Sequence, residues 1–289
     1  MAKIAFLGLG VMGYPMAGHL AAKGHDVTVF NRTAAKAEKW VAEHGGQAAS
    51  TPAQAAKGAD YVFACVGEDN DVREMTVGEH GAFATMPADG VFIDNTTASA
   101  DVARELYAAA EQAGLHFIDA PVSGGQAGAE NGKLSVMCGG DEQAYRRAEA
   151  LMQCYGARVT HMGGSGAGQL TKMVNQICIA GLVQGLSEAL NFGQKAGLDM
   201  ERVLGVVSGG AAQSWQMENR GSTMVKDEFD FGFAVDWMIK DLKICLAEAN
   251  NNGAELPVTA LVSQFYRRLS HQGFGRNDTS SLIRLLKQH

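Results

Sequence analysis

The chain has 289 residues, of which 46% are hydrophobic and 19% charged, with a formal net charge of −7. This length is enough for one large or two moderate domains with buried cores. An acidic balance without a basic run argues against nucleic acid as the main partner. No stretch is long and apolar enough to span a bilayer, so we expect no membrane partner.

Cysteine and histidine usage favours an intracellular protein without a metal. The five cysteines are scattered and form no CxxC pair, which is typical of small core residues in a reducing compartment. The apolar start of the chain is interrupted by glycines and a proline, unlike a signal peptide. We therefore expect a cytoplasmic location. No histidine has a partner at metal-ligand spacing, so we expect no metal site.

A glycine-rich segment follows the first apolar run, residues 3–7. A strand, a GxGxxG segment, an amphipathic helix and a second strand at 26–30 succeed one another, as in the dinucleotide-binding fingerprint. Gly8 permits a tight turn, Gly10 lets the backbone approach a pyrophosphate, and Gly13 allows close helix packing. The helix N-terminus would hold the negative charge. The predicted cofactor contacts here are Gly8, Leu9, Gly10, Val11, Met12 and Gly13.

The residues after the second strand bear on the choice of nicotinamide cofactor. An NAD enzyme would place a carboxylate there to bind the ribose hydroxyls, whereas this chain has Asn31, Arg32 and Thr33. A guanidinium can pair with a phosphate, and no carboxylate repels one. The sequence therefore favours NADP(H), with NAD(H) as the less favoured cofactor. The alternative is that Arg32 is simply a solvated side chain opening the next helix.

Strand and helix signals alternate up to about residue 161. We expect strands at 61–66, 91–94, 116–119, 134–138 and 157–161, with helices such as 99–113 and 142–152 between them. Alternation of this kind predicts a mostly parallel sheet covered on both faces, with ligands at the carboxyl ends of its strands. Val66, Gly67, Asn95 and Thr96 follow two of these strands and are predicted cofactor contacts, although ordinary turn residues would look the same.

A glycine-rich loop is expected between Asp119 and Ala129. Consecutive glycines after Ser123 can offer several backbone N–H groups to one anion, and the hydroxyl adds another donor. Ser123, Gly124 and Gly125 are therefore predicted to bind a substrate carboxylate. The alternative is a flexible loop tip.

Beyond Gly168 the pattern is helical only. Apolar residues recur at helical spacing to about Ala196, and later helices are expected near 199–208, 235–250, 257–272 and 279–287. We predict an α/β Rossmann-type domain with a mostly parallel sheet over residues 1–164. An all-helical domain over 165–289 should follow, joined to the first by a long interdomain helix.

Polar residues begin this long helix. Lys172, Asn175 and Gln176 stand at i, i+3 and i+4, which places an ammonium and two amides on one face. This pattern predicts either chemistry or an ordinary exposed first turn. In a later helix, Lys240 could reach a cofactor or substrate, or form a surface ion pair with Asp241 that is worth little.

With these motifs in place, the chain resembles the β-hydroxyacid dehydrogenase family over nearly its whole length. The motifs that carry the resemblance are Phe6–Ala17, Asp119–Gly132, Gly166–Asn175 and Lys240–Leu242. The resemblance implies that Lys172 is the catalytic acid/base and that residues 123–125 bind the substrate carboxylate. It also implies that Thr96 contacts the nicotinamide riboside and that Lys240 approaches the cofactor.

The resemblance further implies an NADPH-dependent reduction of a small semialdehyde or 2-oxo acid, in the class of glyoxylate, succinic semialdehyde and tartronate semialdehyde, by a homodimer or homotetramer. One alternative is an NAD-dependent 3-hydroxyisobutyrate or serine-type dehydrogenase running oxidatively. A second is a nucleotide-binding module without catalysis. Many members have two asparagines three and four residues after the lysine, whereas here Asn175 precedes Gln176. Both amides are predicted to bind substrate, and the orienting role is open between them.

Overall fold

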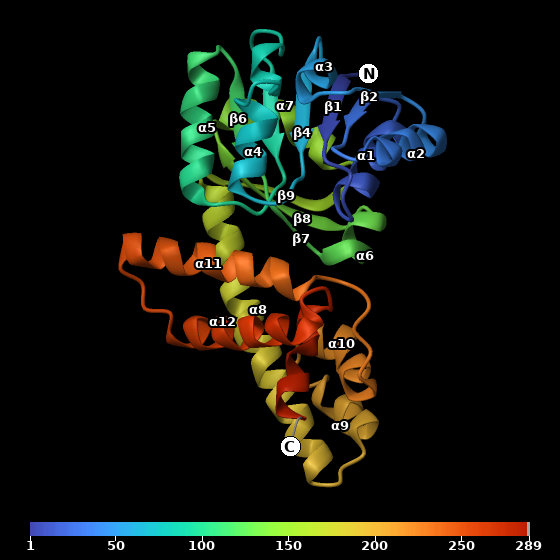
Figure 1. Ribbon diagram of the computed structural model, residues 1–289, viewed down its shortest axis with the longest axis vertical. Helices are drawn as coiled ribbons and strands as arrows, with labels where there is room; N and C mark the ends of the chain where they lie inside the picture. Colours follow the sequence, from blue (N-terminus) through green and yellow to red (C-terminus); the bar gives the residue numbers. More distant parts are fainter. Residues whose placement is uncertain (288–289) are drawn as a thin grey trace. The chain divides into compact units, whose positions relative to one another are not determined.

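The structure is a computed structural model that describes residues 1–287. The chain divides into two compact units, residues 1–172 and a second unit that begins at Met173. The first unit is α/β and the second is helical (Figure 1). Lys172 therefore falls in the first unit, whereas Asn175 and Gln176 fall in the second.

A nine-stranded sheet forms the centre of the first unit. Its order is β3-β2-β1-β4-β5-β6-β8-β7, and β9 pairs with β8. The strands from β1 to β6 pair in parallel, whereas β8 runs antiparallel to both β6 and β7. The predicted mostly parallel sheet is thus confirmed. The strands are β1 (Lys3–Leu7), β2 (Asp26–Phe30), β3 (Gln47–Ala48), β4 (Tyr61–Ala64), β5 (Val91–Asp94), β6 (His116–Asp119), β7 (Val122–Ser123), β8 (Leu134–Gly140) and β9 (Gly156–Gly163).

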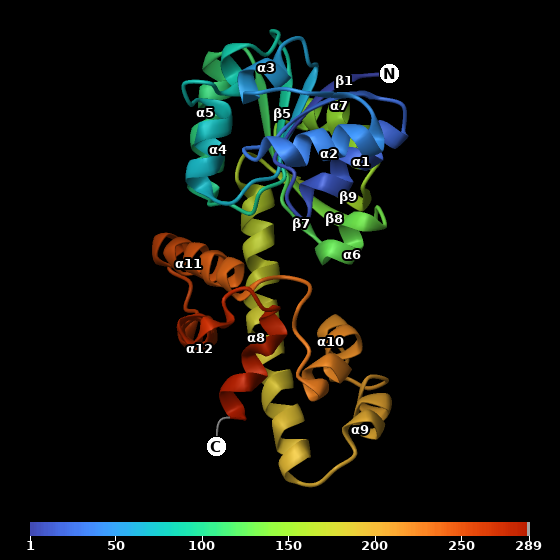
Figure 2. The same cartoon turned by 45° about the vertical axis from the view of Figure 1, so that its right-hand side comes forward.

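Helices cover both faces of this sheet because successive strand side chains point to opposite sides. Phe6 packs in a core with α1, α2 and α7, whereas its neighbour Leu7 packs in a second core with α3, α4 and α5. Figures 1 and 2 show α4 beside α5 and α1 beside α2. The helices are α1 (Gly13–Ala22), α2 (Ala34–His44), α3 (Pro52–Ala56), α4 (Asp69–Thr76), η1 (Ala82–Ala84), α5 (Ala100–Gln112), α6 (Gly125–Glu130) and α7 (Glu142–Met152).

The segment expected as one glycine-rich loop, 119–129, contains the short strand β7 and the start of helix α6. Val122 of β7 pairs with Val136 of β8, and Ser123 pairs with Ser135. A two-residue strand carries no periodicity of its own, so only the pairing with β8 defines it. The predicted carboxylate ligands therefore lie at a strand-to-helix junction.

The second unit consists of helices around two apolar clusters. One cluster joins α8, α11, α12 and η3, and the other joins α8, α9, α10 and η3. The predicted helical C-terminal region is confirmed, although α10 was not expected and the last helix is 3₁₀ rather than α. The elements are α8 (Ala167–Lys195), which begins in the first unit, α9 (Met200–Val207), α10 (Trp215–Lys226), α11 (Val235–Asn252), α12 (Pro257–Leu269), the π-helical turn η2 (Ser270–Phe274) and η3 (Thr279–Leu286).

Candidate functional site

The three glycines of the GxGxxG segment have different surroundings, so a side chain would have a different effect at each of them. Gly8 has a φ of +97°, and a Cβ there would clash with the carbonyl oxygen of Cys65. A Cβ on Gly13 would clash with the carbonyl oxygen of Gly8. A Cβ on Gly10 would meet no other atom within 4 Å. The fold thus requires Gly8 and Gly13, whereas at Gly10 the missing side chain leaves room for a ligand to approach the backbone.

The start of α1 has the properties of an anion site. No side chain caps this helix, so no side-chain oxygen competes for the first N–H groups. Val11 beside it is exposed and Met12 is half-buried. An uncapped and partly exposed helix start of this kind can bind the pyrophosphate of a dinucleotide.

The three predicted residues after β2 have different positions. Asn31 accepts a hydrogen bond from the Leu9 backbone N–H at 2.9 Å and donates one to the Thr33 carbonyl at 3.1 Å. It therefore ties the glycine loop to the start of α2. The Arg32 side chain is 87% exposed, and its Nη1 lies 3.8 Å from Asp71 Oδ1. Such an exposed pair is weak, so the guanidinium can turn to a phosphate.

The predicted contacts after β4 and β5 lie together. The Val66 backbone N–H donates to Thr96 Oγ1 at 3.0 Å, and the Thr96 N–H donates to Asp94 Oδ1 at 3.0 Å. Asp94, Asn95 and Thr96 are all buried. The carboxyl ends of these strands thus carry the polar cluster that their position in a parallel sheet predicts.

Asn95, one of the expected contacts after β5, is held by two hydrogen bonds within the first unit. Its Nδ2 donates to the Ala120 carbonyl at 2.7 Å, and its Oδ1 accepts from Tyr155 Oη at 3.1 Å. The first bond links the end of β5 to the turn after β6, and the second links it to the segment between α7 and β9. Its partners lie 25 and 60 residues away along the chain, so its place after a strand could be predicted from the sequence but these partners could not.

Asp119 holds the start of α8 and was missed as a functional residue. This fully buried carboxylate at the end of β6 accepts hydrogen bonds from the backbone N–H groups of Gly166 at 2.8 Å and Gln169 at 2.9 Å. A negative charge at a helix N-terminus is favourable. Burial nevertheless raises the pKa of Asp119 to about 6, and the backbone hydrogen bonds only partly oppose that rise.

Two glycines, one in α8 and one in β8, allow the start of α8 to lie against the ends of β6 and β8. A Cβ on Gly168 would clash with the carbonyl oxygens of Met137 and Asp119, and a Cβ on Gly139 of β8 would lie 2.5 Å from Asp119 Oδ1. Any larger residue would therefore push α8 away from the strand ends.

Gln169 makes a second connection between α8 and the strand ends. Its Nε2 donates to the Thr96 carbonyl at 2.7 Å, and its Oε1 accepts from the Ala98 N–H at 3.0 Å. Lys172 follows one turn later on α8 and is only 8% exposed. The alternative of an ordinary exposed first turn is therefore wrong for Lys172.

The predicted carboxylate ligands follow in sequence at the β7–α6 junction. Ser123 ends β7, and Gly124 and Gly125 adopt φ values of +132° and +62°. A Cβ on Gly124 would lie 3.1 Å from Leu134 Cδ2. Both conformations favour glycine. They turn the chain from strand to helix directly after the serine.

In the second unit, the predicted amides form a hydrogen-bonded chain with α11, in which Gln176 is buried and Asn175 partly buried. Gln176 Nε2 donates to Asp241 Oδ2 at 2.6 Å, and Asn175 Nδ2 donates to Gln176 Oε1 at 2.7 Å. Lys240 Nζ lies 3.1 Å from Asp241 Oδ1. Asp241 and Gln176 are each 2% exposed. The alternative of a surface ion pair is therefore wrong, because the Asp241 carboxylate is buried.

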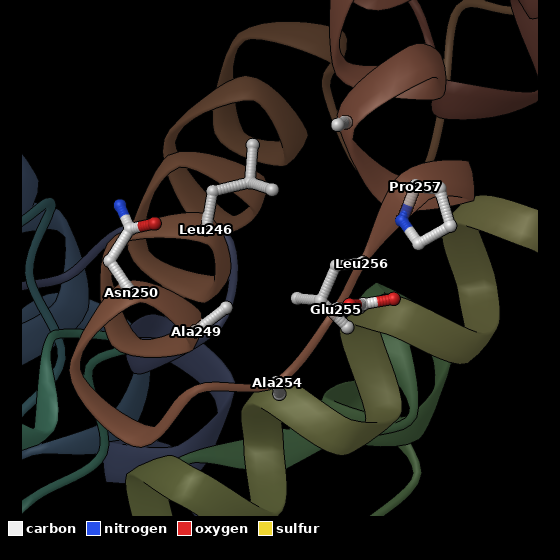
Figure 3. A pocket seen from close by; sticks show the side chains of 8 residues that line it. Leu246, Ala249, Asn250, Ala254, Glu255, Leu256 and Pro257 are labelled. Atoms are coloured by element: carbon white, nitrogen blue, oxygen red, sulfur yellow. The ribbon is translucent and has the colours of Figure 1, made fainter.

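The described chain also has a pocket that lies apart from the predicted site residues. Residues 1–287 contain no group of three potential metal ligands, and none of their helices is long and apolar enough to cross a membrane. A pocket of about 560 Å³ lies at the turn between α11 and α12, lined by residues such as Leu246, Leu256 and Pro257 (Figure 3). It contains none of the predicted site residues and is mostly apolar.

Two family models together match almost the whole chain. The NAD binding domain of 6-phosphogluconate dehydrogenase matches residues 3–164. The NAD-binding domain of NADP-dependent 3-hydroxyisobutyrate dehydrogenase matches residues 166–286.

Individual proteins match over the same length. An uncharacterized oxidoreductase of Shewanella frigidimarina is 58% identical over 288 residues, which cover 100% of this chain and 99% of the relative. The 2-hydroxy-3-oxopropionate reductase of Escherichia coli is 34% identical over 285 residues, 99% of this chain and 97% of that enzyme. The structure of Mycobacterium tuberculosis 3-hydroxyisobutyrate dehydrogenase with L-serine has a TM-score of 0.90 at 31% identity, covering 99% of each chain.

Proposed function

Because the chain belongs to the β-hydroxyacid dehydrogenase family and is an NAD(P)-dependent enzyme acting on a CH–OH group, we propose that it reduces a small semialdehyde or 2-oxo acid with NADPH. The observation that carries this proposal is the placement of Lys172. It is a buried lysine one turn beyond a helix start that Asp119 and Gln169 tie to the strand ends. A buried lysine on an anchored helix is suited to proton transfer to a bound substrate.

In the proposed reaction, Lys172 donates a proton from Nζ to the carbonyl oxygen of the substrate as negative charge develops there. When bound, the nicotinamide supplies the hydride to the carbonyl carbon. Ser123, Gly124 and Gly125 bind the substrate carboxylate and so fix the distance between that group and the reacting carbon. In the opposite direction Lys172 accepts the proton from the hydroxy acid.

The cofactor proposal assigns the adenosine phosphates to the first unit. The pyrophosphate binds at the start of α1, and the 2′-phosphate of NADPH pairs with Arg32. Thr96 contacts the nicotinamide riboside, and Lys240 approaches the cofactor, as the family resemblance implies. Asn31 stands where an NAD-specific enzyme would have a carboxylate. The lack of a carboxylate at this position supports NADPH over NADH.

The substrate proposal rests on the named relatives and on the anion-binding segment. A 2-hydroxy-3-oxopropionate reductase and a 3-hydroxyisobutyrate dehydrogenase bound to L-serine are both similar to this chain. Their named ligands all have a carboxylate and a small oxygen-bearing carbon chain. The second candidate function is therefore an NAD-dependent oxidation of 3-hydroxyisobutyrate or a serine-like hydroxy acid.

A substrate panel separates these two functions. The purified chain is assayed with glyoxylate, succinic semialdehyde, tartronate semialdehyde and methylmalonate semialdehyde, with NADPH and NADH in parallel, by loss of nicotinamide absorbance. The reverse arm uses 3-hydroxyisobutyrate and L-serine with NADP⁺ and NAD⁺. We expect the highest kcat/KM with NADPH and a semialdehyde or glyoxylate. A higher kcat/KM for the oxidation with NAD⁺ would favour the second function.

Lys172→Ala tests the proposed role of the lysine. Loss of the general acid should lower kcat by about 10²–10⁴-fold, while NADPH binding by fluorescence titration stays near that of the wild type. Lys195→Ala is the matched control, since it removes an exposed lysine at the other end of α8. Turnover by Lys172→Ala at the wild-type rate would show that another group transfers the proton.

Subunit association is part of the same proposal. We expect a homodimer or homotetramer from the family resemblance. Large apolar side chains exposed along α8, Val174, Leu182 and Phe192, support an interface there. Light scattering of the purified chain measures the oligomeric state directly.

A further inference from the structure

Two buried side chains, Asp241 of α11 and Gln176 of α8, link Lys240 to Asn175. Lys240 pairs with one oxygen of Asp241, the other oxygen accepts from Gln176, and Gln176 accepts from Asn175. We propose that Gln176 is a positioning residue, which fixes the amide orientation of Asn175, and that Asn175 alone makes the substrate contact. This inference rests on the proposed reductase function and concerns the same site.

The Gln176 amide is occupied by protein partners. One side of Nε2 faces Asp241 Oδ2 at 2.6 Å, Nε2 also lies 3.9 Å from Met238 Sδ, and Oε1 accepts from Asn175. The residue is only 2% exposed. An amide has two N–H donors and one carbonyl acceptor. All three groups of Gln176 are engaged, so a substrate could bind it only by displacing one of these partners.

The direction of each amide follows from the charge of Asp241. An ionised carboxylate can only accept, so the group of Gln176 that faces it must be the nitrogen. Oε1 of Gln176 then faces Asn175. Because this oxygen can only accept, Asn175 must donate to it from Nδ2. The carbonyl oxygen of Asn175 consequently turns away from Gln176. A carboxylate thus determines which atom Asn175 presents, two side chains away.

Lys240 and the length of glutamine both suit this arrangement. The Lys240 ammonium lies 3.1 Å from Asp241 Oδ1 and 5.8 Å from the ring centroid of Trp237, which keeps a positive charge beside the buried carboxylate. Gln176 spans from α8 to α11 and still reaches its neighbour Asn175. An asparagine at 176 is shorter by one methylene, so it cannot keep both bonds from the same backbone position.

The test combines kinetics with side-chain amide NMR. Gln176→Met keeps the size of the side chain but removes every hydrogen bond, and Gln176→Asn keeps an amide with a shorter reach. We expect both variants to lose about 10–100-fold in kcat, with the KM for NADPH changed less than about twofold, because a misaligned contact costs rate rather than cofactor binding. Gln184→Met is the matched control, since it removes an exposed amide-to-carboxylate bond, to Glu188, on the same helix.

A double-mutant cycle separates positioning from direct contact. If Gln176 acts through Asn175, then Gln176→Met added to Asn175→Ala lowers kcat no further than Asn175→Ala alone. Additive losses would overturn the proposal, because they would mean that each amide contributes independently. Wild-type kcat in Gln176→Asn together with a loss in Gln176→Met would also overturn it, because the amide itself would then contact the substrate.

The NMR readout is independent of turnover. With ¹⁵N labels in asparagine and glutamine side chains, we expect the Asn175 amide signal to shift and exchange faster with solvent in Gln176→Met and in Asp241→Asn, but not in Gln184→Met. An Asn175 signal unchanged in both variants would overturn the positioning role. Failure of the proposed reductase function would appear differently, as no turnover by the wild type on any substrate of the panel.

Discussion

At the residue scale, cofactor selectivity depends on Arg32 and on the carboxylate nearest to it. Arg32 is mostly exposed, and Asp71 at the start of α4 lies 3.8 Å from it. The guanidinium attracts a 2′-phosphate, whereas Asp71 repels one and competes for the same cation. The two side chains therefore have opposite effects on the affinity for NADPH.

Substitutions at these two positions should shift selectivity in opposite directions. Arg32→Ala should lower kcat/KM for NADPH by about tenfold or more and leave NADH within about twofold, because a charge-assisted bond to phosphate is lost. Asp71→Asn should raise the preference for NADPH, and its amide oxygen can still accept from the Glu68 N–H as Asp71 does. Arg146→Ala on α7 controls for removal of an exposed arginine. Equal losses with both cofactors in Arg32→Ala would contradict phosphate recognition.

The sequence identified those site residues that belong to a short motif beside a strand or a helix start. The fingerprint glycines and Lys172 stand at fixed spacings beside a strand or a helix start, so the pattern identifies them before any contact is known. Asp119 and Gln169 act through partners 47 to 73 residues away. Asp241 lies beside Lys240 in the chain, but its partner Gln176 is 65 residues distant. These residues could not be assigned a role until the strands and helices were placed.

At the scale of the element, periodicity predicted most of the fold. Alternating strand and helix signals gave the parallel strands, and the 3.6-residue stripe gave α8. The exceptions have physical causes. Strand β7 exists only through its pairing with β8. Helix α10 has few buried residues. Its Arg220 guanidinium lies 4.7 Å from the ring centroid of Phe231 and 3.4 Å from Asp278, so residues outside the helix contribute to its stability.

The start of α8 should make stability depend on pH. The pKa of Asp119 is about 6 in the folded protein and 3.8 in the exposed reference state, because burial disfavours its charge. The folded state therefore holds this proton more tightly, and the contribution of Asp119 to stability is greatest below pH 3.8 and declines up to about pH 6. The difference between the two pKa values corresponds to about 3 kcal/mol.

Denaturant unfolding between pH 4 and 7.5 measures this effect. The unfolding free energy of the wild type minus that of Asp119→Asn should fall by about 2 kcal/mol across this range, which begins just above the lower of the two pKa values. Asp141→Asn, at the partly exposed N-cap of α7, shows what the loss of a capping aspartate does by itself. If this difference in unfolding free energy did not change with pH, then Asp119 would have the same pKa in the folded and unfolded states.

At the scale of the whole molecule, one helix carries two separately anchored groups of polar residues. Gln169 and Lys172 belong to the first unit, where Gln169 is bonded to the strand ends, whereas Gln176 belongs to the second and is bonded to α11. The apolar cores are likewise separate sets of residues. The proposed chemistry therefore depends on the integrity of both units, while the proposed pyrophosphate site depends on the first.

A pair of leucine substitutions tests this division. Leu20 in α1 and Leu190 in α8 are both buried leucines in helices, one in the core beneath the glycine loop and one in the second unit. Each change to alanine should cost about 2–5 kcal/mol of unfolding free energy. Only Leu20→Ala should weaken NADPH binding in a fluorescence titration, because it loosens the helix whose N-terminus is proposed to hold the pyrophosphate. Equal weakening by Leu190→Ala would show that the second unit contributes as much to cofactor binding as the first.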